Sequence, residues 1–486
     1  MAGTMTEADG LPAPRRYWAV AAIALGITLA VIDSAIANVA LPTIAADLRA
    51  EPASSIWVVN GYQLAITVSL LPLSSLGDRI GYRSIYLPGL AIFTLASLGC
   101  ALATSLPNLA IARVIQGFGA AGIMSVNTAL LRFIYPQKLL GRGIGLNALV
   151  VALSAAAGPT LASGILSVAP WPWLFAVNLP IGLAALTLAI PSLPKTPASP
   201  HKFDWLSALL SAATFGLVIG SIDALGQGEA FGLFVVELTA GGILAWILTR
   251  RELGNPAPVL PVDLLRIPIF TLSIATSVCS FAAQMLALVS LPFMLHGLGY
   301  DAVATGLLIT PWPIAIAIAA PLAGHLADRY PAGLLGGIGL AAFSIGLLSL
   351  ALLPASPTPF DIVWRMALCG AGFGTFQSPN NRAMITAAPK SRSGGASGML
   401  GTARLLGQTT GASIVALMFA RVPEHGSVVS LFIAAGCALV AGFVSLARLY
   451  ERPALQVLRP SNPEADPMMH ADVLRAEVRD EPQKEP

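Results

Sequence analysis

A single acidic residue, Asp33, interrupts the apolar stretch from Tyr17 to Leu41. Placing a carboxylate at the centre of a membrane helix costs about 2.5–3.5 kcal/mol, so such residues usually line a cavity and take part in transport or proton transfer. A structural carboxylate paired with a buried base is the alternative. Both interpretations require a basic or amide side chain at the same depth.

Arg113 and Gln116, near the start of another apolar stretch, are candidate partners of Asp33. If the two stretches cross the membrane in opposite directions, a rise of about 1.5 Å per residue places the three groups at similar depths. Small residues recur beside them on one face of each stretch, which permits close helix approach. Burial and a neighbouring arginine act on a carboxylate in opposite directions. Protonation of Asp33 can therefore depend on the side to which it is exposed, as proton coupling requires.

The elements that carry these residues are membrane segments. The chain has 486 residues, 56% of them hydrophobic and 10% charged, with a mean hydropathy of +0.76. Soluble domains carry about 25% charged residues, so the composition excludes a water-soluble protein. Fourteen apolar segments are long enough to cross roughly 30 Å of hydrocarbon. They are 17–41, 56–76, 84–104, 109–130, 143–167, 171–192, 204–223, 230–249, 268–291, 303–323, 332–353, 359–379, 394–420 and 426–448.

The basic residues predict the orientation. Of the 27 Lys and Arg residues, 22 fall in loops and tails on one side of the predicted membrane, and only Arg49 and Arg421 fall on the other. This split favours an even number of crossings with both termini in the cytoplasm. The excess of Arg over Lys suggests a bacterial source, so we expect a multi-pass protein of the inner (plasma) membrane. The first segment is too long for a signal-peptide core, and we expect it to be retained.

A repeat of about 250 residues divides the chain. Leu76-Gly77-Asp78-Arg79 recurs as Leu326-Ala327-Asp328-Arg329, and Arg113 has a counterpart in Arg365. We therefore predict an all-α polytopic membrane protein in which two parallel six-helix halves suit alternating access. The expected parts are a cytoplasmic N-terminus, a first half, a linker with two inserted helices, a second half and a disordered cytoplasmic tail, at 1–16, 17–192, 193–266, 267–449 and 450–486.

The loop after the second segment is a candidate gate. Asp78 can accept hydrogen bonds from a helix N-terminus, and Arg79 and Arg83 can pair with acids across the halves. A loop that only follows the positive-inside rule needs neither Asp78 nor the glycines. The full candidate gate, with the repeat of the motif, is Gly77, Asp78, Arg79, Gly81, Arg83, Asp328 and Arg329.

Two further sets of residues are weaker candidates. Gly145 and Gly158-Pro159 interrupt the fifth segment, where they permit either a bend or close packing. Aromatic and amide side chains suit bulky amphipathic ligands, although packing or lipid contact explains each one equally well. The candidate substrate site is Asp33, Trp57, Asn60, Gln116, Asn127, Gln284, Trp312, Phe376 and Gln377. Glu237 lies in the insertion, where we expect a structural role.

These motifs resemble the major facilitator superfamily, and within it the fourteen-helix drug:proton antiporter family. Asp33 through Pro42 is similar to that family's signature in the first helix. The loop after the second segment, Arg113 with Gln116-Gly117, Gly158-Pro159 and the stretch from Trp173 to Gly182 resemble further motifs. The resemblance implies that Asp33 is a proton and cation site with Arg113 as its partner. It also implies that Asp78, Arg79 and Arg83 form the gate and that Gly145, Gly158 and Pro159 belong to the antiporter motif.

Proton-coupled export of amphipathic or cationic compounds is the function that these features favour. A dedicated transporter of one metabolite, by export or uptake, is the nearest alternative. An ATP-driven pump is disfavoured, because no lysine follows a glycine as a phosphate-binding loop requires. A membrane enzyme built on His296 and Asp301, or a sensor, is more remote. We expect a monomer that binds a small molecule, protons and the lipid bilayer, with no nucleic acid, metal or cofactor.

Overall fold

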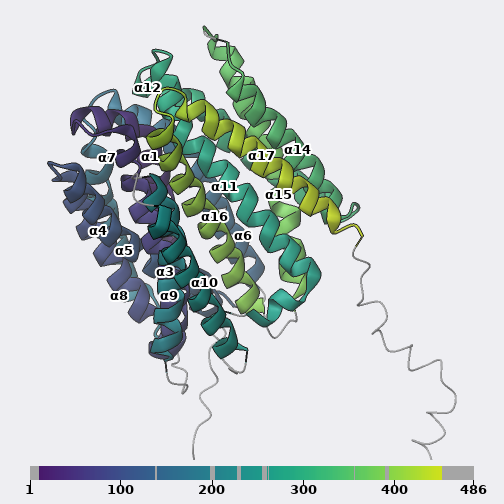
Figure 1. The fold of residues 1–486 in the computed structure, drawn as a ribbon. Coiled ribbons are helices and arrows are strands. Elements are labelled where there is room, and N and C mark those ends of the chain that lie inside the picture. The colour runs from purple at the N-terminus through teal and green to yellow at the C-terminus, as the bar shows by residue number, and fades with distance from the viewer. Residues whose placement is uncertain are drawn as a thin grey trace, which may run out of the picture.

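The computed structural model describes residues 10–450, apart from the short segments 137–138, 197–202, 227–230, 254–259, 261, 355 and 389–392. The predicted tail after residue 450 and most of the predicted N-terminus lie outside the described residues. The described part of the chain consists of helices and their connections, without strands (Figure 1). In chain order the helices are α1 (Ala13–Asp47), α2 (Pro52–Ser55), α3 (Trp57–Ile80), α4 (Arg83–Ala101), α5 (Leu106–Ile134), α6 (Leu140–Leu166), α7 (Trp173–Ala176), α8 (Asn178–Ser192), α9 (Trp205–Gly226), α10 (Phe231–Glu252), a 3-10 helix (Val262–Arg266), α11 (Pro268–Gly297), α12 (Ala302–Ile309), α13 (Pro311–Leu326), α14 (Ala332–Ala351), α15 (Pro359–Ala387), α16 (Ser393–Arg421) and α17 (Gly426–Ala447).

Each of the fourteen predicted segments coincides with one of these helices or with a consecutive pair. Within the described residues, 12 helical stretches are long and apolar enough to cross a membrane. The other two segments are α15 and α16, of 29 residues each, whose polar side chains lower their hydropathy. The all-α polytopic fold is therefore confirmed. Two of the segments are interrupted, between α7 and α8 at Val177 and between α12 and α13 at Thr310.

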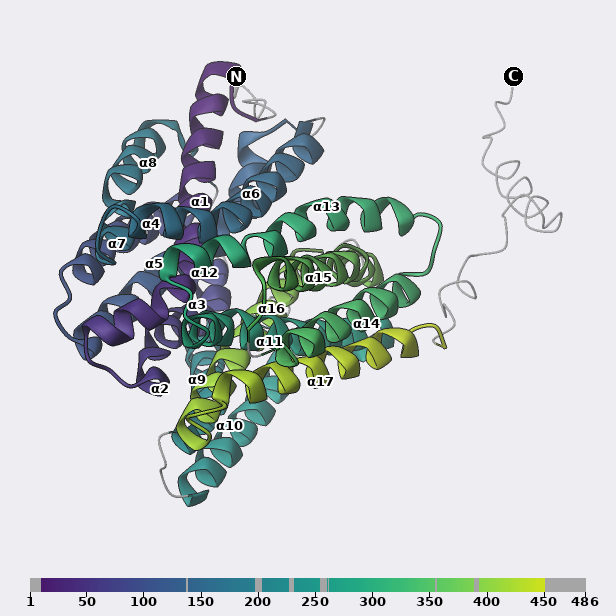
Figure 2. The same ribbon diagram turned by 90° about the horizontal axis from the view of Figure 1, so that it is seen from above.

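The contacts between helices follow the same pattern in two sets, which we call the first half (α1–α8) and the second half (α11–α17). In the first half α5 packs on α3 and α4, and α1 packs on α6 and α8. In the second half α15 packs on α13 and α14, and α11 packs on α16 and α17. Seen from above, the two halves lie side by side, the first in purple and blue and the second in green and yellow (Figure 2).

Glycines bring equivalent helices of the two halves into close contact. A Cβ atom on Gly119 of α5 would lie 2.4 Å from the backbone nitrogen of Phe93 in α4. In the second half, a Cβ atom on Gly372 of α15 would lie 2.5 Å from the backbone nitrogen of Phe343 in α14. Neither position has room for a larger residue, so the same backbone crossing is built twice.

The apolar core joins the halves on one side of the molecule only. We call the side with the start of α1 and the loop between α3 and α4 the terminal side. Away from it, the second part of α1 (Ile36–Ile44) shares one core with α11–α17. Towards the terminal side the first half has a core of its own, to which Leu405 of α16 also contributes, and the second half has a separate small core around Phe270 and Met384. The halves are thus held together mainly on the side opposite the termini.

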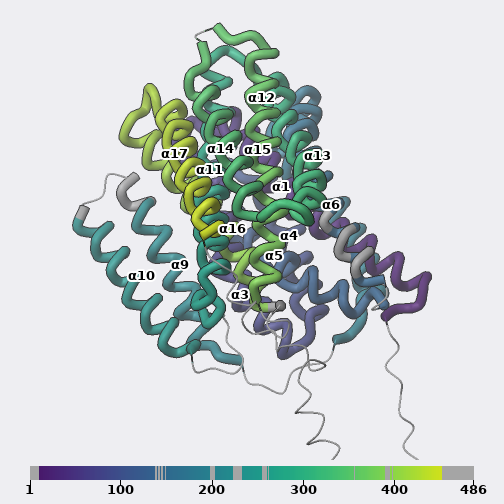
Figure 3. The backbone as a smooth tube through the Cα atoms, turned by 90° about the vertical axis from the view of Figure 1, so that its right-hand side faces the viewer, coloured from purple at the N-terminus to yellow at the C-terminus, as the bar shows by residue number. Residues whose placement is uncertain are grey.

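The two inserted helices pack against the rest of the bundle through α9. It contacts α3 of the first half and α16 of the second half, while α10 packs on α9 at the periphery (Figure 3). Most of the α10 surface is exposed and apolar, as in a helix that faces lipid. Glu237 lies between α9 and α10, close to Gly220, and one of its oxygens is buried without a hydrogen-bond partner.

Candidate functional site

Asp33 lies at the centre of a buried polar cluster. Its carboxylate forms an ion pair with the Arg113 guanidinium. It also accepts hydrogen bonds from the side-chain amides of Gln116 (2.9 Å) and Asn178 (2.7 Å). Asp33 is 1% exposed and Arg113 is 0% exposed, so the pair is shielded from solvent in this conformation. The predicted proximity of Asp33, Arg113 and Gln116 is confirmed.

Neutral groups hold the Arg113 guanidinium in place. Its Nε donates to the backbone carbonyl of Val58 (2.9 Å), and one terminal nitrogen donates to Oε1 of Gln116 (2.6 Å). The guanidinium carbon lies 4.1 Å from the centroid of the Tyr62 ring, a cation–π contact. The other terminal nitrogen is buried without a partner. The guanidinium therefore has hydrogen-bond and cation–π contacts besides Asp33, and these would persist if Asp33 were neutral.

Five helices position this cluster. α1 supplies Asp33, α3 supplies Tyr62, α5 supplies Arg113 and Gln116, and α4 supplies Ser97, whose hydroxyl accepts from Gln116 (2.9 Å). Asn178 comes from the first residue of α8, directly after the interruption that follows α7. The cluster therefore surrounds one buried carboxylate with a strong base and with neutral side chains that can donate or accept hydrogen bonds.

A second polar feature crosses between the halves. Three side chains of α3 face three of α16, in the pairs Asn60–Ser413 (3.3 Å), Gln63–Gln408 (3.4 Å) and Thr67–Thr409 (3.0 Å). We call these six residues the polar seam. The equivalent helices, α6 and α12–α13, meet at Thr160 and Thr310 (2.9 Å). Polar contacts between helices exchange easily, which suits surfaces that must separate and re-form.

The predicted pocket residues have different surroundings. Asn60 is in the polar seam and Gln116 is in the Asp33 cluster. Asn127 accepts no hydrogen bond and donates to Asn147 of α6 (2.9 Å). The partly exposed members are Trp57, Gln284 and Gln377.

Trp312 and Phe376 are packing residues in this conformation. They are 1% and 0% exposed, and their rings stack edge-to-face with Phe343 and Phe373 inside the second half. These two side chains present no surface to a ligand here. They therefore do not line an accessible binding site in this conformation.

The gate residues form local contacts. Asp78 accepts a hydrogen bond from the Tyr82 hydroxyl (2.6 Å), and burial together with this bond raises the pKa of Tyr82. Arg83 donates to the carbonyls of Ile190 (2.6 Å) and Leu193 (3.3 Å) at the end of α8. These partners belong to the first half, so the contacts seen for Asp78 and Arg83 do not bridge the halves, and the gating role stays a prediction.

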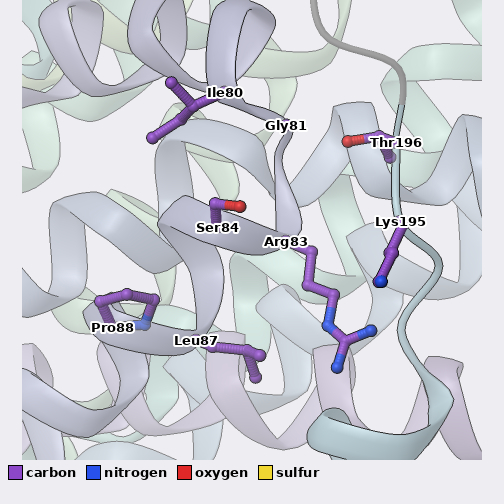
Figure 4. Close-up of a pocket in the computed structure, with 8 residues that line it drawn as sticks. All are labelled: Ile80, Gly81, Arg83, Ser84, Leu87, Pro88, Lys195 and Thr196. Carbon is purple, nitrogen blue, oxygen red and sulfur yellow. The ribbon is translucent and has the colours of Figure 1, made fainter.

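A cavity of about 460 Å³ opens beside this loop, with the side chains of Arg83 and Lys195 at its edge (Figure 4). Gly81, with a φ of +91°, makes the turn into α4 that only glycine adopts easily. In the second half Asp328 forms an ion pair with Arg382, which holds the pKa of Asp328 below its usual range. Arg329 follows in the same turn.

The glycines of the fifth segment lie in α6. Gly145 is in its first part, Gly158 packs against α1 of the same half, and the Pro159 carbonyl oxygen lies close to Gly306 of α12 in the other half. A Cβ atom on Gly158 would lie 2.5 Å from Cβ of Ala35 in α1, so this glycine permits close packing. Its equivalent in the second half is Gly411, where a Cβ atom would lie 2.5 Å from the carbonyl oxygen of Ala282 in α11.

Sequence reasoning missed three participants. Asn178 had a visible signal, since it belongs to the motif from Trp173 to Gly182, but its contact with Asp33 depends on the break between α7 and α8. Gln63 and Gln408 of the polar seam had only their polarity in apolar helices as a signal.

Asp301, a candidate for membrane-enzyme chemistry, caps α12 by accepting from the backbone nitrogen of Ala304 (2.7 Å), which is a structural role.

Comparison with known families decides the affiliation. The family model of the Major Facilitator Superfamily matches residues 23–412 and 273–476. The chain belongs to this superfamily. As a member of the Major Facilitator Superfamily it is a polytopic membrane protein of a transporter family, as the resemblance of its motifs implied.

Three curated relatives in the superfamily indicate the range of functions nearby. The chain is 58% identical to "Uncharacterized transporter YebQ" of Escherichia coli (strain K12) over 446 residues, which are 91% of this chain and 98% of the relative. It is 29% identical to "Riboflavin transporter RibZ" of Clostridioides difficile (strain 630), over 82% of this chain and 87% of the relative. It is 31% identical to "Multidrug resistance protein Stp" of Mycobacterium tuberculosis (strain CDC 1551 / Oshkosh), over 82% of this chain and 75% of the relative.

Proposed function

We propose that this transporter exports amphipathic small molecules, including cationic drugs, in exchange for protons. The Asp33 cluster carries the proposal, because a buried carboxylate with a permanently charged partner is the group that can hold the coupling proton. A relative named as a multidrug resistance protein supports export of drug-like compounds. We place the protein as a monomer in the inner membrane with both termini in the cytoplasm.

The proposed cycle is alternating access between two halves. The halves share a core away from the terminal side and have largely separate cores towards it, which supports a cycle in which they part on the terminal side. Proton binding to Asp33 weakens its attraction to Arg113, and the cluster then rearranges within the first half. Exposure of the substrate and of the proton to opposite sides in the two states gives exchange.

The test is transport in liposomes that contain the purified protein. A pH gradient is imposed, and movement of the fluorescent lipophilic cation ethidium is followed in the wild type, in Asp33→Asn and in Asp47→Asn. Asp47, at the end of α1, accepts a hydrogen bond from the Trp171 indole (2.7 Å) and is a matched control on the same helix. We expect gradient-driven flux in the wild type and in Asp47→Asn, and none in Asp33→Asn. Unchanged gradient-driven flux in Asp33→Asn would overturn the coupling role.

A dedicated metabolite carrier of the same fold is the second candidate. The relative named as a riboflavin transporter favours it. In the same liposomes, riboflavin flux without ethidium flux in the wild type would decide for this candidate. The Asp33→Asn comparison with riboflavin would then test coupling in the same way.

A further inference from the structure

Arg404 is a charged residue inside the bundle that the proposed cycle does not use. It lies in α16, eleven residues after Ser393, which is about 16 Å along the helix and close to its middle. Among the described residues Arg404 forms no ion pair, and its Nε atom is buried without a hydrogen-bond partner. An arginine at this depth without a counter-charge is unfavourable, and an anionic ligand would compensate its charge.

Arg404 lies on the face of α16 that is directed towards the first half. One turn before it, a Cβ atom on Gly401 would lie 3.3 Å from Leu70 of α3. One turn after it, Gln408 accepts from Gln63 of α3 at 3.4 Å, a long hydrogen bond. Leu405 packs with the core of the first half. The Arg404 side chain is only partly buried, so part of it remains accessible beside the polar seam.

The fold itself does not require an arginine at this position. Gly158 of α6 and Gly411 of α16 occupy equivalent places in the two halves, 253 positions apart, each packed against the first helix of its own half. By the same offset, the residue of α6 that corresponds to Arg404 is Val151. An apolar side chain therefore meets the packing needs of this position in the equivalent helix, and the charge in α16 is an addition to the shared architecture.

We infer that Arg404 binds an anionic group, such as a carboxylate, of the transported molecule. This inference rests on the proposed function and names a further group among its substrates, amphipathic molecules that bear an acidic group. The planar guanidinium can hold a carboxylate through two parallel hydrogen bonds, and Gln408, one turn away on the same face, can contact a neighbouring polar group. Leu70 and Leu405 supply apolar contact for the rest of the molecule.

A matched pair of dyes isolates the charge. Rhodamine 110 carries a free carboxylate, and rhodamine 123 is its methyl ester. Binding of each dye to the protein in lipid nanodiscs is measured by fluorescence anisotropy, without a pH gradient, for the wild type, Arg404→Gln, Arg404→Lys and Arg365→Gln. Arg365 also lies inside a helix but has its own carboxylate partner, Asp361 (3.2 Å), so its substitution controls for loss of an intramembrane arginine.

We expect Arg404→Gln to weaken binding of rhodamine 110 about tenfold and that of rhodamine 123 less than about twofold, as loss of a charge-assisted hydrogen bond predicts. The affinity of Arg404→Lys for rhodamine 110 should lie between those of the wild type and Arg404→Gln, because lysine keeps the positive charge but lacks the two parallel donors of the guanidinium. Arg365→Gln should leave the ratio of the two affinities unchanged. The Lys variant also reports on the site if the Gln variant does not fold.

An unchanged ratio of the two affinities in Arg404→Gln would overturn the inference. This result is distinguishable from failure of the proposed function. A wild type that prefers rhodamine 110 through Arg404 but moves no dye under a pH gradient keeps the inferred site and refutes proton-coupled export. Gradient-driven flux with the same dye preference in Arg404→Gln refutes only the role of Arg404.

Discussion

Removal of both charges of the Asp33–Arg113 pair should cost less than the sum of the two single removals. Arg113→Gln leaves a carboxylate that is 1% exposed with only Gln116 and Asn178 as donors, so we expect a loss of about 3–5 kcal/mol in the free energy of unfolding. Asp33→Asn leaves Arg113 bound to the Val58 carbonyl, to Gln116 and to the Tyr62 ring, so its loss should be smaller, about 1–3 kcal/mol.

The double variant, Asp33→Asn with Arg113→Gln, separates stability from transport. With neither charge present, its loss should fall short of the sum of the two single losses by about 1–3 kcal/mol. The assay is unfolding in mixed detergent micelles, followed by tryptophan fluorescence, combined with flux in liposomes. We expect the double variant to lose less stability than the two single variants together and to remain unable to couple transport to protons. Strictly additive losses would refute the claim that the two residues act as a pair, and restored coupling would refute the role of Asp33 as proton carrier.

Two further substitutions test the gate and the helix crossing. Asp78→Asn should lower the maximal transport rate roughly threefold to tenfold with little change in substrate affinity, because it weakens the Tyr82 hydrogen bond that shapes the loop. Tyr82→Phe removes the same hydrogen bond and should have the same effect. Equal losses of transport rate and substrate affinity would contradict a gating role. Gly119→Ala should destabilise the protein by about 1–3 kcal/mol, because the added Cβ clashes with the backbone of Phe93. The control is Gly164→Ala, which has nothing within 4 Å of its Cβ position and should change stability by less than about 1 kcal/mol. Similar melting temperatures for the two variants would contradict the close crossing of α4 and α5.

The helices and the proximity of Asp33, Arg113 and Gln116 could be predicted from the sequence. Apolar length predicts spans directly, and the constant rise of a helix places Asp33, Arg113 and Gln116 at one depth before any packing is known. Asn178 escaped this reasoning because its position depends on an interruption of the helix, and helix interruptions depend on tertiary contacts as well as on local sequence. Depth along a helix was thus predictable, whereas a contact set by a break was not.

Side-chain environment inside the bundle was the part that could not be predicted. An aromatic residue in a membrane helix is equally consistent with a pocket, with lipid and with the core, since all three are apolar. Trp312 and Phe376 turned out to be core residues because α13, α14 and α15 cross closely enough to stack their rings. The partners of Arg83 were similarly open, since a loop arginine can reach either half, and the α8 carbonyls lie nearer.

The position of α9 has a consequence for the rate of transport. This helix touches α3 in one half and α16 in the other, so it cannot remain fixed relative to both if the halves rotate against each other as the proposed cycle requires. At least one of these two helix–helix surfaces would then slide in every turnover. The resistance to this sliding would add to the free-energy barrier of the slowest conformational step. Larger side chains on α9 at either surface would then slow transport although they lie far from Asp33. Small molecules bound at these surfaces would inhibit transport without competing with the substrate.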